Sequence, residues 1–116
     1  MPHDVFISYS SDDKLTANAT CSILEEKKIR CWIAPRDLLP GQEYGEMIVD
    51  AIRNAKIVVL IFSSSAQKSK HVKREIERAV SKGKSILTVR IEDTMPVGSM
   101  EYALSNEHWL DALTPL

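Results

Sequence analysis

Glu75 is the residue of this sequence whose chemistry most needs an explanation. It lies in the largely basic segment KSKHVKREIERAV, residues 68–80, which follows a run of serines. One interpretation is a solvated helix acid that pairs with Lys68 or Lys82, a surface interaction worth about 0.3–0.5 kcal/mol. The other is a single acid inside a pocket. Spacing alone favours the surface pair, but so weak an interaction does not require an acid at this position.

Other familiar catalytic patterns are missing. The sequence has no GxGxxG and no GxxxxGK[ST], and its 3 histidines show no metal-ligand spacing. The serines at residues 63–65 lack a GxSxG setting, so they are interpreted as loop and helix-capping residues. Asp12 and Asp13 would suit a phosphoacceptor receiver domain. That class also requires an aspartate at the end of the third strand, where KIVVLIFSSS has serine.

Composition limits the protein class. The chain has 116 residues, enough for one hydrophobic core, and a formal net charge of −1, which argues against nucleic acid as a partner. No apolar run is long enough to span a membrane, and the segment MPHDVFISYS does not resemble a signal peptide. We therefore expect a cytoplasmic protein without a membrane partner. Cys21 and Cys31 are expected to be reduced and buried, with no disulfide and no metal.

The elements that position these residues follow from hydrophobic patterning. Nearly continuous apolar runs predict strands covered on both faces, at residues 4–8, 30–34, 56–62 and 85–91. Helical spacing predicts helices at residues 12–28, 42–54 and 66–82. The buried positions expected on these helices are Leu15, Ala19, Ile23 and Leu24, then Met47, Ile48, Ala51 and Ile52, then Val72, Ile76, Ala79 and Val80, with Gly83 as a C-terminal cap. Alternating strands and helices predict an open parallel sheet with helices on both faces.

The loops after the strands are where a ligand is expected, because such sheets bind ligands beyond the carboxyl ends of their strands. These loops read SYSSDD, APRDLLPGQEYG, SSSAQKSK and EDTMPVGSM. The second is long and is restrained by Pro35, Pro40 and Gly41. Long loops on a rigid scaffold often carry function.

At these segments the chain resembles a TIR (Toll/interleukin-1 receptor) domain of the bacterial type. DVFISYSSDD is similar to the first box of the family, and RCWIAPRDLLPG to the second strand and its loop. IVVLIFSSSAQKSKHVKREIERAV is similar to the third strand with its helix, and NEHWLDA to the late tryptophan segment. The resemblance implies a flavodoxin-like α/β fold of about five parallel strands. It covers residues 1–116 as one domain. Since the family continues into a last helix, it also implies a chain trimmed from a longer protein.

The resemblance implies an enzyme that cleaves NAD⁺ at the nicotinamide–ribose bond, with Glu75 as the catalytic acid. His71 occupies the position where the family has tryptophan. The substrate contacts carried over are Tyr9, Ser10, Ser11, Leu39 and His71. NAD⁺ is then the substrate, and neither a cofactor nor a metal is expected. The product is ADP-ribose or a cyclic form of it.

The resemblance also implies self-association with other TIR domains in immune or effector signalling. The loop that would mediate it contains Arg36, Asp37, Leu38, Pro40 and Gly41. The alternative function is a non-catalytic TIR–TIR interaction module, in which Leu38 and Leu39 are exposed. Arg36 and Asp37 either pair within the loop or contact a neighbouring copy. Tyr9 either packs or lines the pocket, and both Trp32 and Trp109 are expected in the core.

One glutamate suffices for this reaction because nicotinamide leaves as a neutral base and needs no general acid. The remaining ribosyl cation is stabilised by a carboxylate that only has to be ionised. We therefore expect an ordinary pKa of about 4.3 for Glu75, kept low by Lys73 and Arg74.

Overall fold

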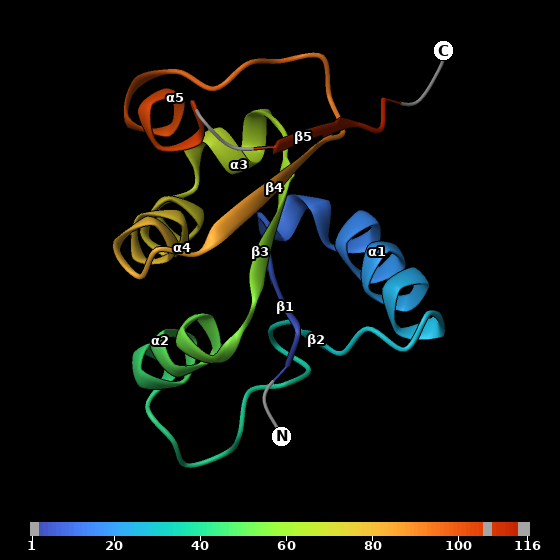
Figure 1. Ribbon diagram of the computed structural model, residues 1–116, viewed down its shortest axis with the longest axis vertical. Coiled ribbons are helices and arrows are strands. Elements are labelled where there is room, and N and C mark those ends of the chain that lie inside the picture. The colour runs from blue at the N-terminus through green and yellow to red at the C-terminus, as the bar shows by residue number, and fades with distance from the viewer. Residues whose placement is uncertain (1–2, 106–107, 114–116) are drawn as a thin grey trace.

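The computed structural model describes residues 3–105 and 108–113, and its centre is a parallel β-sheet. The 5 strands have the order β2-β1-β3-β4-β5 (Figure 1). Their bounds are β1 Val5–Ser8, β2 Cys31–Trp32, β3 Ile57–Phe62, β4 Ser85–Arg90 and β5 His108–Asp111. This topology confirms the predicted flavodoxin-like sheet of about five strands.

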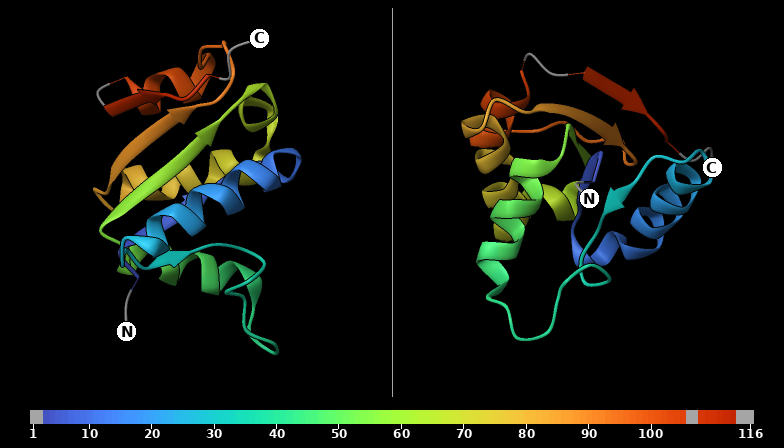
Figure 2. Two further views of the ribbon diagram at one scale, coloured as in Figure 1. Left: turned by 90° about the vertical axis from the view of Figure 1, so that its right-hand side faces the viewer. Right: turned by 60° about the horizontal axis from the view of Figure 1, so that its bottom comes forward.

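Helices cover the sheet on both sides. A 3₁₀ turn at Ser11–Asp13 leads into α1, and α1 lies on one face while α2 and α4 lie on the other (Figures 1 and 2). The helix bounds are α1 Lys14–Glu26, α2 Tyr44–Asn54, α3 Ser64–Lys68, α4 Lys70–Ser81 and α5 Gly98–Leu104. Within the described part of the chain, none of these helices is long and apolar enough to cross a membrane.

The central strand β3 shows why its sequence is continuously apolar. Val58, Leu60 and Phe62 belong to the core beneath α2 and α4, whereas Val59 and Ile61 belong to the core beneath α1. Successive side chains of a strand point to opposite faces, so a strand covered on both faces needs apolar residues throughout. Each such side chain contributes about 1.5–3 kcal/mol when it is fully buried.

The prediction of which face of the first helix is buried is largely wrong. Leu15 is 88% exposed, and α1 instead buries Ala17 and Cys21 against the sheet. These small side chains, four residues apart, form one stripe that lets the helix approach the sheet closely. Leu24 packs beside that core as predicted. Three residues that were predicted to be buried are exposed: Leu15, Ala19 and Ile23.

The predicted helix over residues 66–82 is in fact two helices, α3 and α4. The break is at Ser69, whose Oγ accepts a hydrogen bond from the Val72 backbone N–H at 3.2 Å and caps α4. Val80, predicted to be buried, is exposed, because the face of α4 that packs on the sheet contains Val72, Ile76 and Ala79. The second helix, α2, buries Ile48 and Ile52 as predicted.

The two tryptophans have different environments. Trp32 is buried and stacks on Phe6 with a centroid distance of 5.2 Å, which confirms its place in the core. Trp109 is 37% exposed on the last strand, so the prediction that it is a core residue is wrong. Its ring contacts that of Phe62 edge to face, with a centroid distance of 6.2 Å.

The cysteines are free and buried, as predicted. Burial raises the pKa of the Cys21 thiol and raises that of Cys31 to about 12, so both remain protonated at neutral pH. No cluster of His, Cys, Asp and Glu suited to a metal ion occurs among residues 3–105 and 108–113.

Two helices end in the same backbone motif with different residues. After α4, the N–H groups of Gly83 and Lys84 donate to the carbonyls of Val80 and Ala79 at 3.0 and 2.9 Å, which confirms the predicted cap. Gly83 has a φ of +68°. After α1, the equivalent left-handed position is held by Lys28, with a φ of 65°.

Lys28→Gly is therefore expected to stabilise the fold. A non-glycine residue in the left-handed region costs roughly 1–2 kcal/mol, while glycine loses about 0.5–1 kcal/mol of chain entropy, so the free energy of unfolding should rise by about 0.5–1 kcal/mol. Urea unfolding measures this change. Lys27→Gly is the matched control, because Lys27 has a φ of −90° and the same charge, and it should be neutral or destabilising. A destabilised Lys28→Gly variant would contradict the prediction.

Candidate functional site

Glu75 lies on the side of α4 that faces the end of β1. Its Oε1 accepts a hydrogen bond from the Oγ of Ser8 at 2.7 Å, although the two residues are 67 positions apart. Ser8 is the last residue of β1 and is fully buried. The carboxylate therefore points into the protein, and the surface pairing with Lys68 or Lys82 is not formed.

A cavity of about 200 Å³ opens beside this carboxylate, at the carboxyl ends of β1 and β2. We call it the strand-end cavity. Five of the six predicted catalytic and substrate-binding residues line it: Tyr9, Ser10, Ser11, His71 and Glu75. They meet here because parallel strands end at one edge of the sheet, and α4 begins beside that edge. The other lining residues are Phe6, Ile7, Trp32, Ala34, Tyr44 and Ser69.

Leu39 is the predicted substrate contact that lies elsewhere. It is 56% exposed and lines a separate hollow beside Met47, whose Sδ accepts a hydrogen bond from the Leu39 backbone N–H at 3.2 Å. Within one copy of the chain it does not line the strand-end cavity.

A second and larger cavity, of about 500 Å³, adjoins the first between α2 and α4. We call it the α2–α4 cavity. Tyr44, His71 and Glu75 line both cavities, so the carboxylate borders both. The Tyr44 and His71 rings meet edge to face with a centroid distance of 6.0 Å. The other residues that line the α2–α4 cavity are Gly45, Ile48, Val49, Arg74, Glu77, Arg78 and Ser81.

The electrostatics of Glu75 correct the sequence-based expectation. Burial raises the pKa of this carboxyl to about 7, and the hydrogen bond from Ser8 lowers it only partly. The expectation of an ordinary pKa near 4.3, maintained by Lys73 and Arg74, is therefore wrong. Desolvation dominates because the carboxylate points into the protein.

Two tyrosines flank the carboxylate as neutral groups. The Tyr9 hydroxyl donates to the Ala34 carbonyl, so this side chain both packs and lines the cavity. Burial, and then the charge of Glu75, raise the pKa of Tyr9 and of Tyr44. Sequence reasoning missed Ser8 and Tyr44. For Ser8 a signal was available, since a serine closing an apolar strand is an unusual buried residue.

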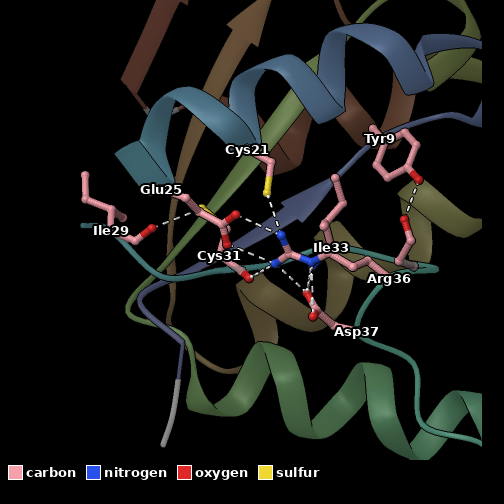
Figure 3. A network of polar contacts seen from close by, with 9 residues as sticks. Tyr9, Cys21, Glu25, Ile29, Cys31, Ile33, Arg36 and Asp37 are labelled. Atoms are coloured by element: carbon pink, nitrogen blue, oxygen red, sulfur yellow. Dashed lines mark hydrogen bonds and ion pairs between the residues drawn. The ribbon is translucent and has the colours of Figure 1, made fainter. Parts of the chain in front are cut away.

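The loop after β2 is held by an internal ion-pair network (Figure 3). Arg36 binds Glu25 at 2.8 Å and Asp37 at 2.9 Å, and its Nη2 donates to the Cys31 carbonyl at 2.7 Å. Asp37 in turn accepts the Ile33 backbone N–H at 2.9 Å. Of the two alternatives for Arg36 and Asp37, the structure shows the pair within the loop, and α1 supplies a further carboxylate.

Further along the same loop, the two leucines differ. Leu38 packs against the core, so the prediction that it is exposed is wrong, whereas Leu39 is exposed as expected. Pro40 and Gly41 are exposed, and Gly41 has a φ of +83°, where the chain turns back toward α2. The loop therefore presents Leu39, Pro40 and Gly41 outward.

Comparison with known families agrees with this arrangement of elements. The family model described as TIR domain matches residues 5–115. The chain belongs to this family. A solved TIR domain, from the Toll-related receptor TRR-2 of Hydra magnipapillata, is 25% identical, with a TM-score of 0.81 over 95% of this chain and 84% of that one.

Two further relatives are animal proteins as well. The TIR-STING receptor of C. gigas, solved with 2′,3′-cGAMP, is 26% identical, with a TM-score of 0.74 over 97% of this chain and 36% of that one. The "Stimulator of interferon genes protein" of Magallana gigas is 37% identical over 82 residues, 68% of this chain. The chain spans 20% of that protein's length. The bacterial type stays a prediction, because these relatives are animal proteins.

The raised pKa of Glu75 predicts a pH-dependent gain in stability for Glu75→Gln. A carboxyl with a pKa near 7 in the fold and near 4.5 when unfolded stabilises the fold below pH 4.5, and this contribution is lost as pH rises through 7. Relative to the wild type, Glu75→Gln should therefore gain about 1–3 kcal/mol of unfolding free energy between about pH 4.5 and pH 8.5.

Urea unfolding of both proteins across this range measures the difference. Glu77→Gln is the matched control for the loss of a charge from the same helix, because Glu77 is an exposed acid on α4. A constant difference for Glu75→Gln would show that the carboxyl titrates at its ordinary pKa.

Proposed function

We propose that this TIR domain cleaves NAD⁺ at the nicotinamide–ribose bond, with Glu75 as the catalytic carboxylate. The observation that carries the proposal is the hydrogen-bonded, desolvated carboxylate at the border of two cavities. A desolvated carboxylate lowers the stability of the fold, whereas a surface acid does not. Such groups concentrate at functional sites.

In the proposed reaction the bond between ribose C1′ and the nicotinamide nitrogen breaks. Its electron pair goes to the pyridinium, so nicotinamide departs neutral and positive charge develops on the ribose. The ionised Glu75 stabilises this charge, and low polarity around it strengthens the attraction. Water then adds to C1′ and loses a proton, which gives ADP-ribose. An internal nucleophile of the adenine half would give the cyclic product instead.

The remaining side chains of the strand-end cavity have supporting roles in the proposal. Tyr9, Ser10 and Ser11 offer neutral polar groups to the substrate, with Tyr9 held by its bond to Ala34. His71 stands at the position of the family's tryptophan, and its contact with Tyr44 adds a second ring. Because the two rings are nearly perpendicular, at 73°, each would offer a separate ring face for stacking in place of the one flat surface of a tryptophan.

Self-association is the proposed means of activation. Leu39, Pro40 and Gly41 project outward and would contact a neighbouring copy, while the Arg36 network keeps the base of the loop fixed. In this arrangement Leu39 would reach a substrate in the site of the next copy. That role would explain why Leu39 lies outside the strand-end cavity of its own copy. We propose NAD⁺ and other TIR domains as partners, and a cytoplasmic role in immune or effector signalling.

The second candidate function is a non-catalytic interaction module. It is favoured by the outward-facing residues of the same loop, which a preordered contact would bury. Both functions use this surface, but only the first requires the carboxylate.

Glu75→Gln is expected to lower nicotinamide release by at least about 100-fold, because it removes the charge that stabilises the ribosyl cation and keeps the shape. The measurement uses bead-clustered protein with NAD⁺, with products identified by mass. Glu101→Gln is the control, since this exposed acid on α5 lines neither cavity, and it should leave turnover unchanged. Full activity in Glu75→Gln would move the chemistry elsewhere, and inactive wild-type protein would favour the interaction module.

The pH profile gives an independent check of the same carboxylate. Since Glu75 must be ionised and its pKa is about 7, kcat/KM for NAD⁺ should rise about tenfold per pH unit below 7 and level off above it. Nicotinamide release by clustered protein between about pH 5 and pH 9 tests this dependence. A profile already flat at the lower end of that range would be incompatible with a desolvated catalytic carboxylate.

A further inference from the structure

The α2–α4 cavity carries cationic groups that the chemistry at Glu75 does not use. Arg74 and Arg78 both line it, on the same helix as the carboxylate. His71, Arg74, Glu75 and Arg78 are spaced i, i+3, i+4 and i+7, so they form one stripe along α4. The stripe runs beside the buried residues of the helix and faces α2.

These guanidinium groups are available to a ligand. Among residues 3–105 and 108–113, neither Arg74 nor Arg78 has a side-chain hydrogen bond or an ion pair, and Glu77 in the same cavity pairs with neither. Other arginines of the fold form ion pairs. Arg36 pairs with Glu25 and Asp37, and Arg90 pairs with Asp93 and Asp111.

The sizes and linings of the two cavities indicate that one ligand would occupy both, with its anionic part in the α2–α4 cavity. The strand-end cavity, at about 200 Å³, is smaller than the roughly 300–1,000 Å³ typical of small-molecule sites. Its lining contains neither lysine nor arginine. A ligand reacting at Glu75 must therefore extend into the α2–α4 cavity of about 500 Å³, and an anionic part would find its cations only there.

We infer that Arg74 and Arg78 bind the phosphate groups of the substrate, so that the site selects a dinucleotide over the corresponding nucleoside. The inference rests on the proposed cleavage at Glu75. Arg78 lies three residues beyond Glu75, about 4.5 Å along the helix axis, and a long side chain extends its reach further. Guanidinium groups suit this task, because their paired N–H donors match phosphate oxygens.

Turnover of two substrates with the same leaving group tests the inference. NAD⁺ has a pyrophosphate, whereas nicotinamide riboside has no phosphate. In clustered Arg74→Gln/Arg78→Gln protein, kcat/KM for NAD⁺ should fall roughly tenfold, mainly through KM, while that for nicotinamide riboside stays within about twofold. The matched control is Lys70→Gln/Lys82→Gln, which removes the same charge from the two ends of α4 outside the cavity lining.

Two results would overturn the inference. An equal loss for both substrates would mean that the arginines act on the chemistry or the fold, and an unchanged KM for NAD⁺ would mean that they bind no phosphate. The substitution Arg78→Lys, which keeps the charge and loses the paired donors, should give an intermediate KM.

A binding measurement separates this inference from the proposed function. ADP-ribose is titrated into isotope-labelled wild-type protein and into the Arg74→Gln/Arg78→Gln variant, with NMR shifts as the readout. We expect roughly tenfold weaker binding by the variant. If the wild type cleaves neither substrate but this difference is found, the catalytic proposal fails and the phosphate site stands. Equal binding by both proteins, or none by the wild type, overturns the phosphate site.

Discussion

The contact between Ser8 and Glu75 is the interaction on which the site depends. It joins the end of the first strand to the middle of α4, and it provides the hydrogen bond that a carboxylate turned away from water needs. One hydroxyl does not fully compensate for burial, so the pKa remains raised. The fold thus holds an acid at a cost in stability, a feature that is common at functional sites.

The scaffold makes this placement possible. A parallel sheet with helices on both faces brings the ends of β1 and β2 to one edge, and α4 lies beside them because Val72, Ile76 and Ala79 fix it to the sheet. The same helix therefore has a buried stripe that sets its position and a polar stripe that borders the cavities. A rigid support for a reactive group on a helix is more precise than a support on a loop.

The loop after β2 combines a fixed base with an exposed tip. Arg36 connects this loop to α1 through Glu25 and to the first residue of β2 through the Cys31 carbonyl, whereas Leu39 stays exposed. Adjacency in the chain gave the pair with Asp37 as one of two alternatives. It could not predict Glu25, which is eleven positions away on another element.

The sequence by itself determined the sheet, the order of the elements and the identity of the candidate acid. Short, continuous apolar runs rich in β-branched residues, such as IVVLIF, favour a strand buried on both faces, and the family motifs single out Glu75. Tertiary structure decided the rest. Which stripe of α1 is buried depended on how closely Ala17 and Cys21 let it approach the sheet. The ionisation of Glu75 depended on desolvation and on Ser8, because a pKa reflects the surroundings of a group in space and not its neighbours in the chain.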